Sequence, residues 1–493
     1  MTRVSTHSAD PPGSAGRAGL GAQAGSAGQV RRSGTYGPLA GHGPIERVMS
    51  TVIRKLSWSR LADPKVAVTV SGVGLLLGML VGATAPNSET LPIKLPLSYL
   101  LPSLGSSDAI AMTMLYTGDV LACLGLAGML WAHSQGWRPD PRRLLMASAA
   151  IVAVMVSLTP VGSSDIASYA AYGRIASLGG NPYTHSPVAA LGAHSPYLQA
   201  VGTVWKNQPS VYGPIATVVQ SFAASVGGRS VATTIWILMI LNGAVFIGLG
   251  FLLLKTSDDP VRATLFWVAN PVILQQLVSG GQLDTFVAAA AICSIQVARR
   301  VSGAWGDVLV GVLIGLACGI KINAVLIGIG LAWPLLRRRE WMRVTRMTAM
   351  ALATFAIEYS VYGLDALKST FHGLKWVIMP SPWRLFQMAG EALGISQATL
   401  TTVIGFLWPI AMIFVAWLIY RRISSDQPRE VVAPFALTFA WVLVAPWVFA
   451  WYTAIAWATL TLVPRNRMTR WLTIVTVFLA LWLSNGGQGT PVR

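Results

Sequence analysis

The sequence has few charged residues, few acidic ones in particular, and only three cysteines. Charged side chains make up 11% of the 493 residues, and Asp and Glu together number 18, whereas soluble domains carry roughly 25% charged residues. This composition excludes an ordinary soluble protein. Cys123, Cys293 and Cys318 lie within apolar stretches without metal-ligand spacing, so neither a disulfide framework nor a zinc site is predicted.

The sequence also lacks a glycine-rich phosphate loop of the dinucleotide-binding or Walker type before a helix in a polar segment. A domain that binds a nucleotide sugar is therefore not expected. Apolar residues are abundant instead: 54% of the chain is hydrophobic, with 19 Trp and a mean hydropathy of +0.58. These features predict an all-α polytopic membrane protein.

Thirteen apolar runs are long enough, or nearly so, to cross a bilayer. They lie at about 66–84, 109–132, 144–161, 231–254, 263–279, 283–298, 306–320, 322–336, 345–362, 399–419, 431–449, 451–464 and 471–485. A further apolar segment, 212–227, decides the topology. If it lies in the interface, the later basic clusters between the runs all face the cytoplasm, as the positive-inside rule requires.

This topology places the amino terminus inside, the carboxyl terminus outside, and the chain in the cytoplasmic membrane as one transmembrane domain over residues 46–493. The net charge of +18 then belongs to cytoplasmic loops beside membrane lipids, and no nucleic-acid partner is expected. Residues 1–45 are rich in Ala, Gly and Ser without an apolar core, so a disordered cytoplasmic tail is predicted and not a signal peptide. The large external loops are 162–230 and 363–398, and we expect interfacial helices within them.

The segment VGSSDIASYAAYGRIASLGGNPY, residues 161–183, places Asp165, Tyr169 and Tyr172 at helical spacing where an apolar run ends. A carboxylate at a membrane boundary indicates a functional site, although SSD before a helix is also a typical amino-terminal cap. Both interpretations can hold for one residue. The two tyrosines can bind a substrate through their hydroxyls or belong to an interfacial aromatic belt.

The sequence resembles the actinobacterial polyprenol-phosphomannose-dependent α-1,6-mannosyltransferases, which have the GT-C architecture. The resemblance covers most of residues 60–485. Its most specific elements are the D-x3-Y-x2-YGR…G-x-NPY block and the YGP motif. The segments that carry it are 165–183, SVYGP (210–214), GGQLDTF (280–286), GLACGIKINAVL (315–326) and the Trp/Tyr cluster of APWVFAWY (445–452).

The resemblance implies a GT-C fold and a mannose donor carried on polyprenyl phosphate. It implies an acceptor that is a lipid-anchored α-1,6-mannan of the lipomannan type, and transfer with inversion at the external face. An Asp on the first external loop acts as the general base, a role that falls to Asp165. Such a base contributes roughly 10²- to 10⁴-fold, because a sugar hydroxyl must lose its proton as the new bond forms. No cofactor is implied, and with few external carboxylates we expect no metal ion, although a divalent ion is not excluded and chelation would test it.

Two cations are predicted to contact the donor phosphate and to stabilise its developing charge. Lys321 lies between apolar runs in an otherwise uncharged segment, where snorkelling is the alternative. Arg384, in SPWRLF, has the planar fork that suits a phosphate. His372 and Lys375 share its loop and are candidate substrate ligands or simply solvated charges. Arg174 either joins the site or maintains local structure.

The remaining candidate substrate-binding residues are aromatic or acidic. The resemblance implies that Asp284 helps to orient the acceptor or the base, and a cap on the helix that starts at Thr285 explains this residue equally well. Tyr212 belongs to the YGP motif. Trp447, Trp451 and Tyr452 can form a platform for a sugar ring or part of an aromatic belt.

Three other functions stay open at this stage. The same architecture would serve a transferase that uses glucose, galactose or arabinofuranose on the same type of carrier, because selectivity depends on a few hydroxyl contacts. Many apolar spans with buried charges are also a feature of secondary transporters. A lipid-binding scaffold is the third alternative, and it would not need the Asp165 carboxylate for more than stability.

Overall fold

The computed structural model describes residues 63–105, 108–373, 376–423 and 427–482. Helices make up most of these ranges, and an isolated antiparallel bridge pairs Thr90 with Val161. All described residues belong to one compact unit, Met49–Arg493. The predicted tail, 1–45, lies outside the described residues.

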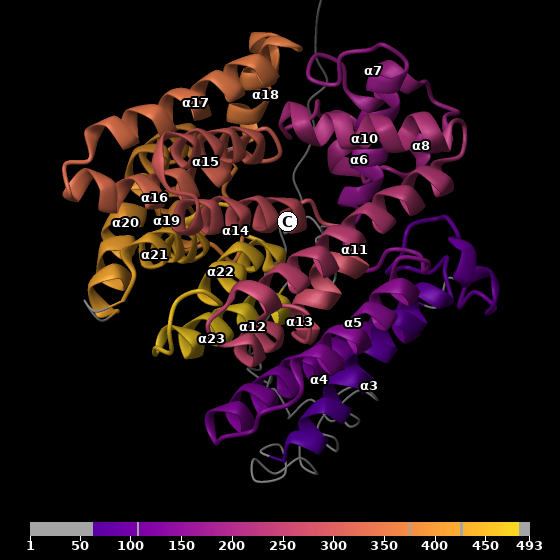
Figure 1. Cartoon of the computed structure of the whole chain (residues 1–493). Helices are drawn as coiled ribbons and strands as arrows, with labels where there is room; N and C mark the ends of the chain where they lie inside the picture. The colour runs from indigo at the N-terminus through magenta and orange to yellow at the C-terminus, as the bar shows by residue number, and fades with distance from the viewer. Residues whose placement is uncertain (1–62, 106–107, 374–375, 424–426, 483–493) are drawn as a thin grey trace, which may run out of the picture. The chain divides into compact units, whose positions relative to one another are not determined.

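The helices follow one another along the chain without strands between them in the described ranges (Figure 1). The longer helices are α3 (Pro64–Ala83), α4 (Asp108–Ser134), α5 (Pro141–Met155), α6 (Asp165–Ser177), α10 (Pro214–Gly227), α11 (Val231–Thr256), α14 (Asp284–Arg300), α15 (Gly303–Cys318), α16 (Val325–Arg337), α17 (Trp341–Ser360), α18 (Leu364–Gly373), α19 (Pro382–Ala392), α20 (Gln397–Arg422), α21 (Arg429–Val444) and α23 (Met468–Trp482). The short helices and turns are η1 (Pro96–Tyr99), α7 (Pro187–Leu191), α8 (Pro196–Ala200), α9 (Thr203–Lys206), α12 (Pro260–Phe266), α13 (Pro271–Ile273), η2 (Leu274–Ser279), η3 (Ile322–Ala324), η4 (Ala450–Tyr452) and α22 (Thr453–Leu460).

Many of these helices begin with the same short signal, a polar cap followed by proline. Asp63 accepts a hydrogen bond from the amide of Lys65 at the start of α3, and Asp140 does the same for Arg142 at the start of α5. The cap satisfies an amide that has no partner within the helix, and proline is tolerated there because its missing N–H would be unpaired anyway.

Within the described ranges, four helices are long and apolar enough to cross a membrane: α3, α4, α11 and α20. A fifth span results if Pro271–Ser279 and Asp284–Arg300, which meet at a bend of 116°, form one broken crossing. The helices expected at 66–84, 109–132, 231–254 and 399–419 are confirmed, as is the all-α class. The total of about thirteen spans and the GT-C fold stay predictions.

Two expected continuous runs are interrupted. The helix expected over 144–161 ends at Met155, and the chain then passes through Pro160 and through Gly162, whose φ is +84°. Proline cannot continue a helix, and the positive φ suits glycine. Asp165 therefore begins a new helix, α6, and does not end a span. The run expected over 263–279 was also wrong as a single helix, because α12 ends at Phe266 and α13 begins at Pro271.

Glycines allow neighbouring helices to pack closely at two contacts. Helices α3 and α4 lie side by side (Figure 1), and a Cβ added at Gly74 would lie 2.7 Å from the carbonyl oxygen of Gly118. At the contact between α6 and α10, a Cβ added at Gly173 would collide with the Gln220 backbone. Small residues at such contacts let helix backbones approach each other.

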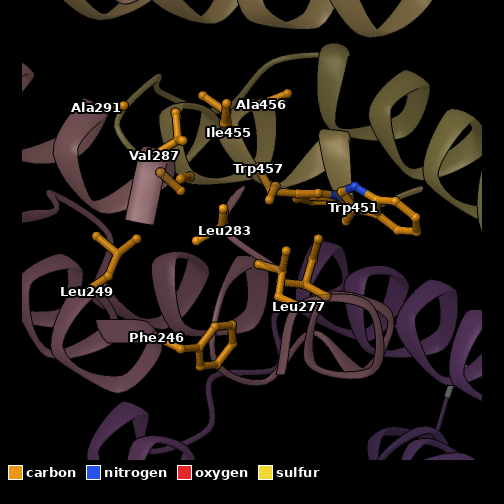
Figure 2. Close-up of a cluster of buried hydrophobic side chains, with 14 of the residues drawn as sticks. Phe246, Leu249, Leu277, Leu283, Val287, Ala291, Trp451, Ile455, Ala456 and Trp457 are labelled. Atoms are coloured by element: carbon orange, nitrogen blue, oxygen red, sulfur yellow. The ribbon is translucent and has the colours of Figure 1, made fainter. Parts of the chain in front are cut away.

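A buried apolar cluster joins the middle of the chain to its late aromatic segment. Figure 2 shows Phe246 of α11 and Leu277 of η2 near Trp451 and Trp457, and all four side chains belong to the main hydrophobic core. The Trp457 indole N–H donates to the Thr476 hydroxyl at 2.9 Å, as a buried indole usually requires a partner. This core supports the turns that carry the candidate site.

Candidate active site

The candidate site is a cavity of about 910 Å³ between the start of α6, the segment before α9, the turn after α15, and the segment between α21 and η4. A cavity of this size lies at the upper end of ordinary ligand pockets. Its wall brings together residues that are far apart in the sequence. The predicted site residues that line it are Asp165, Tyr212, Lys321, Arg384, Trp447, Trp451 and Tyr452.

Asp165 is the first residue of α6, and its side chain is half-buried in the cavity wall. The capping position belongs to Ser164, and no side-chain capping hydrogen bond forms at this helix start. Burial raises the pKa of Asp165 to about 6, while Lys321 and the nearby Trp205 side chain act in the opposite direction. A carboxylate with these surroundings can accept a proton near neutral pH.

Lys321 and Asp284 form a buried ion pair beside Asp165. The Nζ atom of Lys321 lies 2.6 Å from Oδ2 of Asp284, and the exposed fractions of the two side chains are 12% and 0%. Nζ also lies 4.9 Å from the ring centroid of Tyr452 and 5.8 Å from that of Tyr212. The second oxygen of Asp284, Oδ1, has no hydrogen-bond partner among the described residues. The cation is thus held by one carboxylate and two aromatic faces.

The YGP motif and the glycine before Lys321 fit together through their backbones. The amide of Gly213 donates to the carbonyl of Ile320 at 3.0 Å, and the amide of Ile215 donates to that of Gly319 at 2.8 Å. A Cβ added at Gly213 would collide with Gly319. These bonds fix the turn that presents Lys321, and they explain why glycine occurs in both motifs.

The two tyrosines of α6 lie beneath the cavity and do not line it. Tyr169 is 1% exposed, donates to Oε1 of Gln282 at 3.1 Å, and meets Tyr212 edge to face at 4.9 Å. Tyr172 donates to the carbonyl of Gln208 at 3.0 Å. Their position supports the cavity wall from behind, and the helical face predicted from the spacing is present.

Arg384 and Arg174 are the other two predicted cationic ligands whose side chains the structure describes. Arg384 lies on α19 and lines the cavity. Its Nη1 donates to Gln387 at 2.7 Å and lies 3.4 Å from Glu391. Arg174 instead lies over the ring of Tyr197, 5.8 Å from its centroid. Lys375 and the side chain of His372 lie outside the described part of the chain.

Two residues of the cavity wall could not be recognised as site residues from the sequence. Trp205, on α9, and Trp376, before α19, stack with Trp447, and the centroid separations are 5.4 Å from Trp205 to Trp376 and 4.9 Å from Trp376 to Trp447. Their sequence separations gave no reason to join them. Only the folded chain brings these indoles to one wall.

The residues present can perform proton transfer and can stabilise an anion. A carboxylate is exposed to the cavity, and two cations are in its wall. Among the described residues, no group of three or more His, Cys, Asp and Glu side chains is placed to hold a metal ion.

A family model described as "Alpha-(1->6)-mannopyranosyltransferase, N-terminal domain" matches residues 66–337, more than half of the chain. A probable alpha-(1->6)-mannopyranosyltransferase of Mycolicibacterium smegmatis is 24% identical, over 61% of this chain and 51% of its own. Alpha-(1->6)-mannopyranosyltransferase B of Corynebacterium glutamicum is 26% identical, over 38% and 33%. Alpha-(1->6)-mannopyranosyltransferase A of Mycobacterium tuberculosis is 24% identical, over 71% and 72%.

The chain therefore spans about half the length of the M. smegmatis relative and a third of the C. glutamicum one. No solved structure matches it. The matched region contains Asp165, Asp284 and Lys321, three charged residues of the site described above. The resemblance stated from the motifs is thereby confirmed: the chain belongs to the alpha-(1->6)-mannopyranosyltransferase family.

Proposed function

We propose that this protein transfers mannose from polyprenyl-phosphomannose to a lipid-anchored α-1,6-mannan, with inversion, at the external face of the cytoplasmic membrane. The observation that carries the proposal is the Asp165 carboxylate, which lies in the cavity wall, makes no capping bond, and shares the cavity with Lys321 and Arg384. The family membership and the names of the relatives support the sugar and the linkage.

In the proposed reaction, the 6-hydroxyl of the acceptor gives its proton to Asp165 as its oxygen bonds to the anomeric carbon of the donor. The bond from that carbon to the phosphate oxygen breaks, and its electron pair leaves with the polyprenyl phosphate. Attack opposite the leaving group converts a β-linked mannosyl phosphate into an α-mannoside. The products are the extended glycan, polyprenyl phosphate and a proton that Asp165 returns to solvent.

The two cations have different roles in this proposal. Lys321 is already paired with Asp284 and enclosed by two tyrosines, so it contributes mainly a fixed positive field. Arg384 is held by neutral Gln387 and a longer contact to Glu391, and its side chain is 28% exposed. We therefore expect Arg384 to make the direct phosphate contact, since its fork binds a phosphate with two N–H groups.

A second candidate function is transport of a lipid or sugar. The observation that favours it is the 116° bend between Pro271–Ser279 and Asp284–Arg300, because broken helices often form transporter sites. A transporter would not form a covalent product. Its transport would also continue when the Asp165 carboxylate is replaced by an amide of the same shape.

The test is transfer of radiolabelled sugar from purified polyprenyl-phosphate sugars to an α-1,6-mannoside acceptor, with GDP-mannose as the control donor. We expect product from polyprenyl-phosphomannose alone. Asp165→Asn should lower the rate roughly 10²- to 10⁴-fold with an unchanged unfolding temperature. Product from another carrier-linked sugar would move the assignment to that sugar, and full activity in the variant would remove Asp165 as the base.

A further inference from the structure

Three tryptophans from three separate segments form one group at the wall of the cavity. The planes of Trp205, Trp376 and Trp447 lie within 24–28° of one another. The centroids of Trp205 and Trp447 are only 6.5 Å apart, so the three rings form a triangle and not a linear stack. Trp376 overlaps both of the others. The amide of Ile378 donates to the carbonyl of Pro446 at 3.0 Å, which fixes the Trp376 segment beside Trp447.

The group lies beside the carboxylate that the proposed reaction uses. Trp205 and Asp165 line the same cavity, and the Trp205 side chain lies near enough to lower the pKa of Asp165. The turn before α9 packs against the start of α6, since a Cβ added at Gly202 would lie 2.9 Å from the Ser164 hydroxyl oxygen. A hydroxyl that gives its proton to Asp165 therefore belongs to a molecule that lies next to these indoles.

We propose that Trp205, Trp376 and Trp447 form the subsite for the acceptor glycan, in which a hexopyranose ring packs its apolar C–H face on the indoles while its hydroxyl reaches Asp165. This subsite rests on the proposed function, because it assigns the acceptor of that reaction. Aromatic side chains offer a large apolar surface at a small cost in conformational entropy. A sugar ring has an apolar face and a polar rim, and both have partners here.

Polar groups near the indoles match the rim of a sugar. Gln199, Thr203 and Thr370 line the same cavity. The indole N–H of Trp447 and Oδ1 of Asn323, also in the cavity wall, have no hydrogen-bond partner among the described residues. An unpaired buried polar group is costly, and sugar hydroxyls would supply both a donor and an acceptor.

The donor is expected at the other end of the aromatic wall. From Trp447 the aromatic contacts continue to Phe449, at 5.9 Å, and from Phe449 to Tyr452, at 5.7 Å. Tyr452 is the ring that lies closest to the Lys321 ammonium. Lys321, whose positive field the proposed reaction uses at the donor phosphate, is thus at the Tyr452 end, and the Trp205 end carries the ring that acts on the Asp165 carboxylate. This order assigns the tryptophan group to the acceptor.

The test measures binding without turnover, so its outcome does not depend on the donor. Saturation-transfer NMR with detergent-solubilised full-length protein would follow titration with α-1,6-mannotetraose. We expect the wild type to bind it and Trp376→Ala to bind about tenfold more weakly, whereas Trp376→Phe keeps part of the affinity. Trp305→Ala is the matched control, since that side chain is 78% exposed on α15 and lies outside the cavity wall; it should bind as the wild type does.

Two results would overturn the subsite: no binding by the wild type, or equal binding by the wild type and by folded Trp376→Ala and Trp376→Phe. If transfer is also measured, the acceptor KM should rise about tenfold in Trp376→Ala with the donor KM unchanged. A rise in the donor KM alone would assign the indoles to the donor. Loss of transfer in Asp165→Asn with retained tetraose binding would separate the base from the subsite.

Discussion

The two ends of helix α15 carry acidic and basic side chains in contrasting arrangements. Near its start, Asp307 accepts hydrogen bonds at both oxygens from Arg343 and Arg346, at 2.6 to 3.1 Å. Just beyond its other end, Lys321 pairs with one oxygen of Asp284, and the second oxygen has no partner among the described residues. Asp307 and Cys318, the last residue of the helix, are 11 positions apart, so about 16 Å of helix separates the two groups.

The two groups differ in how exposed their side chains are and in how many carboxylate oxygens have hydrogen-bond partners, more than in charge. Arg343 and Arg346 are 37% and 33% exposed, so water would replace either of them at little cost. Lys321 and Asp284 are nearly inaccessible, and removing one leaves the other as an uncompensated buried charge. The Asp307 group anchors a helix end. The Lys321 pair fixes a positive charge in the cavity wall, and Asp284 itself is buried behind that wall.

The largest expected effect comes from Lys321→Met. The variant leaves Asp284 buried without its cation, which should lower the free energy of unfolding by about 3–5 kcal/mol. Sugar transfer should fall by more than about a hundredfold, because the positive field near the donor phosphate is lost. Chemical denaturation in detergent and the radiolabel assay measure the two effects.

Arg346→Met is the matched variant at the other end of α15. Arg343 still binds Asp307 in this variant, so we expect a loss of about 1 kcal/mol or less and unchanged transfer. Equal destabilisation by the two methionine variants would contradict the comparison.

The double variant Lys321→Met with Asp284→Asn separates stability from function. Removing both charges takes away the uncompensated carboxylate, and replacing a buried pair by neutral groups is often close to neutral for stability. We expect at least half of the lost unfolding free energy to return while transfer stays as low as in the single variant. Recovery of transfer together with stability would show that the pair is only structural.

A third, smaller effect concerns pH. Burial raises the pKa of Asp165 to about 6, and a general base works only when deprotonated, so kcat/KM should fall about tenfold per pH unit below that value. The nearby Trp205 side chain lowers this pKa, as does Lys321, whereas Asp284 raises it. Trp205→Phe should therefore move the acidic limb to higher pH. An unchanged limb in that variant would show that Asp165 is not the group that titrates.

Much of the helical framework could be predicted from the sequence, because the signals are local. Apolar runs of about 20 residues predicted α3, α4, α11 and α20. The breaks after Met155 and Phe266 were missed, although Pro160 and Pro271 mark both places. Run length alone cannot tell a straight helix from two short ones that pack inside the protein.

The charged residues of the candidate site could be predicted from the sequence, whereas the aromatic residues that only the packing of distant segments brings together could not. Asp165 and Lys321 stand out because ionisable groups are rare in apolar surroundings. The ion pair between Lys321 and Asp284 was not predicted. Lys321 was expected to contact the donor phosphate, and in the structure it binds Asp284 directly. Trp205 and Trp376 had no signal, since aromatic residues are common in membrane proteins and the contacts that single these two out are not local.

The smallest expected effect is that of Asp307→Asn. An asparagine keeps the shape of the side chain and one acceptor oxygen, and the two arginines it would release are already partly solvated. We expect unchanged transfer, an unchanged acidic limb, and a loss of about 1 kcal/mol or less in the free energy of unfolding. The informative comparison is with Asp284→Asn, the same chemical change at the other end of α15. Because Asp284 is fully buried and binds Lys321, Asp284→Asn should lower the rate of transfer strongly. Equal transfer rates in Asp284→Asn and Asp307→Asn would show that the Lys321–Asp284 pair is no more important for function than the Asp307 group.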